Sequence, residues 1–129
     1  MNKSRLTLSV LPERLAICRL QANSAIPDWA LYSPQLTSIT RTQDELSIVC
    51  PESDAPEGIS VEKGWNAFKV EGPLGFSLTG ILASLATPLA EANISIFAVS
   101  TFETDYLLVK ADKLGQAVKV LSRFCNLEQ

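Results

Sequence analysis

The start of the chain alternates apolar and polar residues in two short runs, a pattern typical of β-strands. Residues 6–11 form the first run and residues 14–20 form the second, with Pro12 and Glu13 breaking the alternation between them. Because both runs are extended and the break is short, we expect them to pair with each other as a hairpin.

The remainder of the first half is also rich in strand-like runs. Residues 25–33 hold Pro27 at a plausible first helical position, so we expect at most a short helical turn there. Residues 35–41 and 46–50 contain apolar and β-branched residues on either side of a polar turn, which predicts a second hairpin. Residues 51–64 then carry prolines, glycines and acidic residues, the composition of a solvated connector between two halves of the chain.

The second half changes from strand periodicity to helix periodicity around a loop. Residues 65–71 alternate, which predicts a strand that buries Phe68 and Val70. Residues 72–75 read Gly-Pro-Leu-Gly and fit neither a helix nor a sheet, so we expect a loop. A helix is predicted over 76–92, because its apolar residues fall on one face: Leu78, Leu82, Leu85, Leu89 and Ala92.

Two residues shape the end of this predicted helix. Pro88 cannot donate a hydrogen bond to the carbonyl of Ser84, which predicts a kink near 84–88. Asn93 adopts the left-handed conformation more readily than most residues, so we expect the helix to end there.

Two further strands and a second helix follow. Residues 94–99 are apolar on both faces and predict a central strand parallel to residues 65–71, and residues 106–110 return antiparallel to it. Asp112 is placed to cap a helix whose apolar face comprises Leu114, Ala117, Val118, Leu121 and Phe124. The order β-α-β-β-α indicates an α+β fold with a mixed, mostly antiparallel sheet and both helices on one face.

Composition excludes several classes of partner. The 129 residues are 47% hydrophobic and 19% charged, as in a folded globular chain, and the formal net charge is −3. A net negative charge does not attract phosphate backbones or anionic lipid headgroups, so we expect no nucleic-acid or membrane partner. No window reaches the ~18 apolar residues of a membrane span, and residues 1–5 do not begin a signal-peptide apolar block. We therefore expect a cytoplasmic protein.

The chain has no histidine and three cysteines. Without histidine there is no Ser-His or Cys-His nucleophile pair, and the most common zinc ligand is missing. Cys18, Cys50 and Cys125 lie apart among apolar residues, so we expect them to be buried, reduced thiols. No phosphate-binding glycine motif or metal-ligand cluster is present in the sequence either, and we expect no catalytic residue, no cofactor and no metal.

Two long blocks carry a resemblance to a known family. Residues 64–83 read Gly-Trp-Asn-Ala-Phe-Lys-Val-Glu-Gly-Pro-Leu-Gly-Phe-Ser-Leu-Thr-Gly-Ile-Leu-Ala, and residues 94–110 read Ile-Ser-Ile-Phe-Ala-Val-Ser-Thr-Phe-Glu-Thr-Asp-Tyr-Leu-Leu-Val-Lys. Together they resemble the ACT-domain superfamily, and within it the small bacterial ACT proteins that are similar to the CASTOR arginine sensors of animals. The resemblance implies ferredoxin-like βαββα units, with an ACT domain at 64–129 and a degenerate, strand-rich ACT-like unit at 1–63.

The resemblance also implies regulatory binding of a small ligand, commonly an amino acid, between ACT units and without catalysis. We expect the chain to be a homodimer that reports ligand occupancy to a regulated protein partner, since residues 94–99 and 106–109 are too apolar for an isolated small unit. The alternative is a structural or protein-interaction module that has lost its ligand.

The first part of the expected ligand site is the loop after residue 71. Backbone amides at the start of a helix favour an anion, so a ligand carboxylate is expected at residues 75–78, with Ser77 or Thr79 adding a hydroxyl donor. The alternative is that Gly75 only makes the turn and Ser77 only caps the helix. The expected ligand-binding residues of this segment are Gly72, Leu74, Gly75, Phe76, Ser77 and Thr79.

The second part is the turn between the last two predicted strands. Its expected ligand-binding residues are Ser100, Thr101, Phe102, Thr104 and Asp105. Asp105 offers a carboxylate to an ammonium or guanidinium group, and the CASTOR-like pattern places the aspartate of this segment at the ligand site. Alternatively, Asp105 is an ordinary turn aspartate, and Phe102 and Tyr106 belong to the core instead of walling a pocket. Asp44 and Glu45 form a carboxylate pair, but a solvated hairpin turn accounts for them better than acid–base chemistry.

Overall fold

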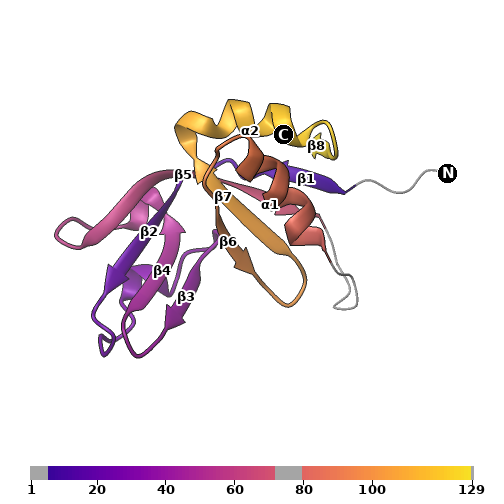
Figure 1. Ribbon diagram of the computed structural model, residues 1–129. Coiled ribbons are helices and arrows are strands. Elements are labelled where there is room, and N and C mark those ends of the chain that lie inside the picture. The colour runs from indigo at the N-terminus through magenta and orange to yellow at the C-terminus, as the bar shows by residue number, and fades with distance from the viewer. Residues whose placement is uncertain (1–5, 72–79, 129) are drawn as a thin grey trace. The chain divides into compact units, whose positions relative to one another are not determined.

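The computed structural model describes residues 6–71 and 80–128 (Figure 1), and its contacts divide the chain into two units. Unit 1 comprises Met1–Pro12 and Asn66–Gln129, and unit 2 comprises Glu13–Trp65. The strand Thr7–Val10 falls in the expected N-terminal unit 1–63, whereas its contacts place it in unit 1 with the C-terminal residues. The reason is that Leu8 and Val10 pair antiparallel with Val70 and Phe68.

Unit 2 is an antiparallel sheet in the order β3-β4-β2-β5. Two short 3-10 helices, η1 and η2, complete it. Its elements are β2 (Leu15–Leu20), η1 (Asp28–Ala30), β3 (Ser38–Arg41), β4 (Leu46–Pro51), η2 (Glu52–Asp54) and the first part of β5 (Ser60–Val70).

Four predictions for the first half of the chain have clear outcomes. The hairpin of residues 35–41 with 46–50 is confirmed as β3 and β4, and the short helical turn is confirmed as η1. The hairpin of residues 6–11 with 14–20 is wrong, because β2 pairs with β4 and β5 while β1 (Thr7–Val10) pairs with β5 and β8. The connector 51–64 is shorter than expected, because β5 begins at Ser60.

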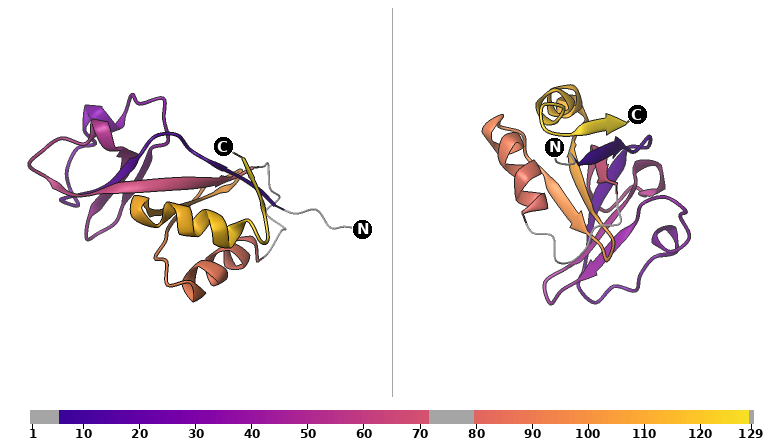
Figure 2. Two further views of the ribbon diagram at one scale, coloured as in Figure 1. Left: turned by 90° about the horizontal axis from the view of Figure 1, so that it is seen from above. Right: turned by 90° about the vertical axis from the view of Figure 1, so that its right-hand side faces the viewer.

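Unit 1 adds two helices to a mixed sheet (Figure 2). Strand β8 lies parallel to β1, β1 is antiparallel to β5, and β7 pairs with both β5 and β6. Besides β1 and the second part of β5, its elements are α1 (Ile81–Glu91), β6 (Phe97–Ser100), β7 (Asp105–Lys110), η3 (Ala111–Lys113), α2 (Leu114–Leu121) and β8 (Asn126–Glu128). The expected β-α-β-β-α order is confirmed, and β8 extends it.

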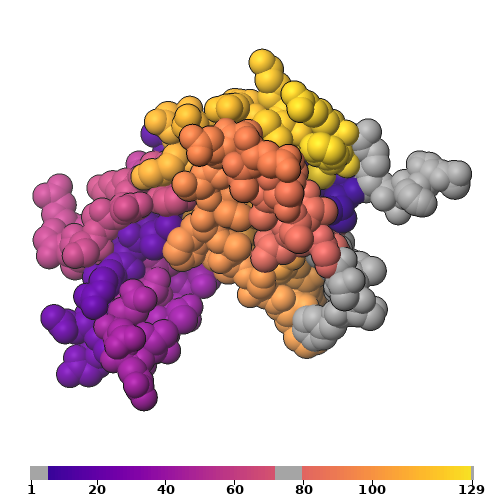
Figure 3. All heavy atoms as spheres, viewed as in Figure 1, coloured from indigo at the N-terminus to yellow at the C-terminus, as the bar shows by residue number. Residues whose placement is uncertain are grey.

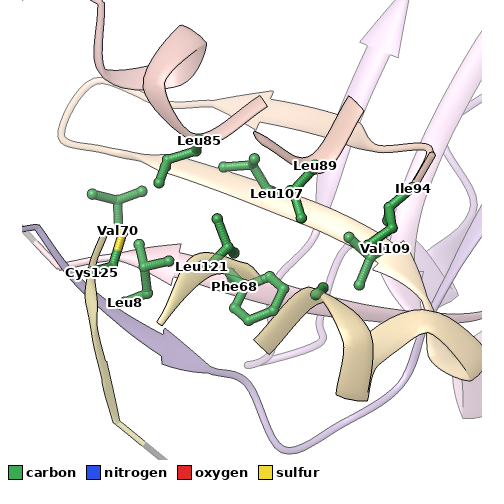
Figure 4. Close-up of a cluster of buried hydrophobic side chains, with 11 residues drawn as sticks. Leu8, Phe68, Val70, Leu85, Leu89, Ile94, Leu107, Val109, Leu121 and Cys125 are labelled. Atoms are coloured by element: carbon green, nitrogen blue, oxygen red, sulfur yellow. The ribbon is translucent and has the colours of Figure 1, made fainter. Parts of the chain in front are cut away.

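The helices and the sheet of unit 1 share one hydrophobic core (Figure 4). Alternate strand residues and one face of each helix supply its buried members: Leu8, Phe68, Val70, Leu85, Leu89, Ile94, Leu107, Val109, Ala117, Leu121 and Cys125. Because α1 and α2 both pack into this single cluster, they cover the same face of the sheet. This confirms an α+β fold with a mostly antiparallel sheet and helices on one face.

The expectation of a central strand at 94–99 is wrong. In the described part of the chain β6 begins at Phe97 and pairs only with β7, so it is an edge strand. Asn93 adopts a φ of 65°, and the Ile94 amide donates to the Leu89 carbonyl at 2.9 Å. Residues just after Asn93 therefore close the helix, as the asparagine predicted, and the strand starts later.

The helix starts also differ from expectation. Gly80 has a φ of 78°, which a right-handed helix does not accommodate, and α1 begins at Ile81. Residues 76–79 of the predicted helix lie outside the described residues. Pro88 lies inside α1, and the kink near it stays a prediction. Asp112 does not cap α2, because it lies in η3 and α2 begins at Leu114 without a side-chain cap.

Among the described residues, no helix has the length and apolar character needed to cross a membrane.

Candidate functional site

A tight turn joins β6 and β7 at the second segment expected to bind ligand. The strands end on the pair Ser100 and Asp105. Within the turn, the Thr101 amide donates to the Thr104 carbonyl at 2.8 Å, and the Thr104 amide donates to Thr101 Oγ1 at 3.2 Å. The Thr101 hydroxyl also donates to the Thr104 carbonyl, at 3.1 Å. These local bonds fix the turn before any ligand binds.

A buried hydroxyl attaches this turn to the end of β5. Thr104 is only 6% exposed, and its Oγ1 donates to the carbonyl oxygen of Val70. Val70 is the last residue of β5 and stands two positions before Gly72. The bond thus holds the second expected binding segment beside the strand that leads into the first one.

Replacing Thr104 by valine is expected to lower the free energy of unfolding by about 1–3 kcal/mol, because the buried Val70 carbonyl loses its hydrogen-bond donor. Urea denaturation followed by circular dichroism measures the effect. Thr40→Val is the matched control, since Thr40 is exposed on β3 and its substitution is expected to change stability by less than about 0.5 kcal/mol. Equal effects of the two substitutions would contradict the anchoring role of Thr104.

Asp105 faces the helix-bearing side of the sheet. Side chains alternate along a strand, and Leu107 and Val109 of the same strand point into the core shared with the helices. Asp105 has the same parity, is partly buried, and stands opposite the exposed Ser100. The pair presents a carboxylate and a hydroxyl together, at the end of the sheet where Figure 1 also shows the first turn of α1.

The start of α1 supplies partial positive charge at this end of unit 1. The first intrahelical bond joins the Ser84 amide to the Gly80 carbonyl at 2.8 Å, so the amides of residues 81–83 have no acceptor within the helix. Whether the amides of residues 75–78 also face a ligand stays a prediction, because these residues lie outside the described part of the chain. The expected ligand residues Gly72, Leu74, Gly75, Phe76, Ser77 and Thr79 lie outside the described residues, and their roles stay predictions.

The two aromatic residues of the hairpin do not wall one pocket. Tyr106 is adjacent to Asp105 in β7 and pairs with Val99, so it faces the side of the sheet away from the helices. Phe102 lies in the turn and is 79% exposed, so it does not belong to the core. Only Phe102 of the pair is accessible to a ligand that approaches Asp105 at the turn.

Sequence reasoning missed a second acidic group close to this end of the sheet. Glu71 follows β5, and its carboxylate accepts a hydrogen bond from Ser9 Oγ and lies 3.9 Å from Lys69 Nζ. The alternation of Lys69 and Glu71 on one side of the strand was the available signal. Because Glu71 is already occupied by these two neighbours, Asp105 is the better acceptor for a ligand cation.

The neighbouring carboxylates Asp44 and Glu45 of unit 2 lie in an exposed turn. Asp44 and Glu45 both donate their amides to Thr42 Oγ1, at 3.0 Å and 3.1 Å. Glu45 Oε1 lies 3.9 Å from Arg19 Nε, in side chains that are about half exposed. This confirms a solvated hairpin turn at 42–45.

The three cysteines are free and buried, as expected. Cys18 on β2 and Cys50 on β4 are hydrogen-bonded to each other, and burial raises the pKa of both thiols. For Cys50 the pKa rises to about 12, mainly through burial and also through the neighbouring Cys18 and Asp54. Such thiols stay protonated and are poor nucleophiles and metal ligands.

Comparison with known sequences assigns both halves of the chain. A family model described as an ACT domain matches residues 60–123, and a model of an N-terminal domain matches residues 13–58. The human cytosolic arginine sensor for mTORC1 subunit 1 is 45% identical over 60 residues, which are 46% of this chain and 18% of the sensor. The chain therefore matches less than a fifth of the length of these curated relatives.

Solved structures share the fold of this chain. Protein Atu0741 from Agobacterium tumefaciens is 42% identical, with a TM-score of 0.89, over 98% of this chain and 96% of that one. The aspartate kinase of Clostridium acetobutylicum shares the fold over 90% of this chain and 34% of its own, with a TM-score of 0.67 at 13% identity. The family match, together with the βαββα core, shows that the chain belongs to the ACT-domain family.

Proposed function

We propose that this protein is a non-catalytic regulatory module that binds an amino acid at the β6–β7 turn. The observation that carries the proposal is the placement of Asp105, on the helix-bearing side of a turn that Thr104 anchors to the end of β5. Membership of the ACT-domain family supports the amino-acid class of ligand. The name of the arginine sensor among its relatives makes arginine the first ligand to test.

The proposed recognition uses opposite charges at the two ends of the ligand. The Asp105 carboxylate accepts hydrogen bonds from the ligand ammonium or guanidinium group. The ligand carboxylate binds near the start of α1, where backbone amides and the helix dipole favour an anion, and residues 72–79 contribute further donors. Ser100 is opposite Asp105 and supplies a hydroxyl to the same ligand.

Adding arginine, and then each of the other common amino acids, is expected to raise the melting temperature of the protein. With free ligand at about 100 times its dissociation constant, the added stability is about 2.7 kcal/mol, which corresponds to several degrees. Asp105→Asn is expected to lose most of this shift while melting close to the parent temperature without ligand, because a partly exposed turn carboxylate contributes little packing. Differential scanning fluorimetry measures both quantities.

Asp112→Asn is the matched control, since Asp112 is an exposed aspartate of the same unit and lies on η3. The control is expected to respond to ligand as the parent does. If no common amino acid shifts the melting temperature at millimolar concentration, the interaction-module alternative replaces the sensor. If Asp105→Asn responds as the parent does, the ligand binds elsewhere.

In this proposal, ligand occupancy is signalled through contacts with other protein chains. A regulatory unit that does no chemistry itself acts by contact with another protein, so the module is proposed to act as a homodimer that signals occupancy to a regulated partner. Binding stabilises the liganded conformation of each unit, and a partner that prefers one occupancy state reads it by differential affinity.

A further inference from the structure

The homodimer of the proposed function requires an interface, and the hairpin strands β6 and β7 do not provide an exposed apolar face for it. Leu107, Leu108 and Val109 are completely buried inside the chain, so the apolar character of β7 is already satisfied. In the described part of unit 1, the exposed large hydrophobic side chains are Phe102 and Phe124. Phe124 follows α2, whereas Phe102 lies in the turn that carries the ligand site.

A groove of about 440 Å³ lies between α1 and α2, beside Phe124. Pro88 and Ala92 form one apolar wall, and Val120 and Phe124 form the other. The two helices are in contact and are exposed together on one side of the molecule (Figure 3). Phe124 is 53% exposed, so unit 1 presents an aromatic side chain beside a groove that has both apolar and charged lining.

The two walls of the groove carry opposite charges. The α1 wall bears Glu91, and the α2 wall bears Lys119 and Arg123, all of them exposed. Neither ion pair of the described residues includes them. A twofold axis over the groove brings the acidic wall of one copy against the basic wall of the other, which is the self-complementarity that an isologous interface requires.

We propose that the groove between α1 and α2 is the homodimer interface, with Phe124 of each copy seated in the groove of the other. Each aromatic ring fills a depression lined by Pro88, Ala92 and Val120, which buries apolar surface on both copies. Around it, Glu91 of each copy pairs with Arg123 and Lys119 of the second copy. A partner of one charge sign would complement only one of the two walls, whereas a second copy complements both.

Charge reversal at the groove tests the interface. Glu91→Arg and Arg123→Glu are each expected to raise the dimer dissociation constant at least about tenfold, because each places like charges opposite each other at two symmetric positions. Sedimentation velocity from about 1 to 200 μM distinguishes the 14.0 kDa chain from the dimer. Glu57→Arg, in an exposed loop of unit 2, is the control and is expected to leave the dissociation constant unchanged.

Mixing the two charge-reversal variants tests the twofold arrangement more sharply than either variant alone. When Glu91→Arg and Arg123→Glu proteins are combined, the heterodimer contains one Glu91–Arg123 pair and one Arg–Glu pair with the charges exchanged, so both contacts are restored. We expect the mixture to dimerise as the parent does, although each variant alone is mainly monomeric. Phe124→Ser is expected to abolish dimerisation with little loss of fold, because its ring is half exposed.

Several results would overturn the proposal. They are a parent chain that is monomeric throughout the concentration range, single reversals that dimerise like Glu57→Arg, and a mixture that stays monomeric. A dimer insensitive to all these changes would mean that another surface, such as the open edge of β6, forms it. Amino-acid binding at Asp105 is measured separately, so a failure of this interface and a failure of the proposed function are distinguishable.

Discussion

Replacing Phe68 by alanine is expected to lower the free energy of unfolding by about 3–5 kcal/mol. Phe68 is on β5, is completely buried, and is the largest of the fully buried side chains. Its ring lies in the cluster that α1, α2 and the sheet share, so truncation leaves a cavity that no single element can close (Figure 4). Since small domains are stable by only about 5–15 kcal/mol, the variant is expected to be partly unfolded at 37 °C.

Chemical denaturation in urea, followed by near-UV and far-UV circular dichroism, measures this loss. Phe102→Ala is the matched control, because the same atoms are removed from a side chain that is 79% exposed. The control is expected to change the free energy of unfolding by less than about 1 kcal/mol. A Phe68 variant as stable as the Phe102 variant would show that the shared cluster is not the core of unit 1.

The features that sequence predicted are those with a local signal. The leucine spacing along α1 and the β-branched runs of β3 and β4 each determine an element from neighbouring residues. The leucine stripe continues upstream of Gly80, whereas the left-handed backbone at that glycine precedes the first residue of α1, Ile81. The pattern of apolar positions carries no information on the backbone conformation of a glycine.

The features that were missed depend on contacts between distant residues. Residues 7–10 alternate like any hairpin strand, and only their pairing with the end of β5 and with β8 decides which unit they join. Strand β8 has three residues, too few for a periodic signal. The number of partners of β6 follows from sheet order, which the apolar composition of residues 94–99 does not determine.

The candidate site also combines features that have a local sequence signal with features that depend on contacts between distant residues. The chemistry of Asp105 and its place next to a turn are visible in the sequence, and alternation along β7 then determines which face it occupies. The hydrogen bond from the Thr104 hydroxyl to the Val70 carbonyl joins residues 34 positions apart. The sequence around a threonine in a turn does not indicate so distant an acceptor.

Raising the pH above 9 is expected to destabilise the protein through Cys50. The thiol has a pKa of about 9.0 in an unfolded chain, and burial raises its pKa to about 12 in the folded protein. Between these values the unfolded state has released the proton and the folded state has kept it. Stability therefore falls with rising pH, by about 1.4 kcal/mol per pH unit from this group.

Urea denaturation of the reduced protein at pH 8 and pH 10.5 tests this slope, and the expected loss from Cys50 is about 2 kcal/mol. Cys50→Ala is expected to be less stable than the parent at pH 8, because it leaves a cavity, but to lose less stability between the two pH values. Groups that titrate in both proteins cancel in this comparison. Since burial also raises the pKa of Cys18, the double variant with Cys18→Ala is expected to lose still less. If the parent and Cys50→Ala lose the same amount, the buried thiol pair does not control the alkaline stability of unit 2.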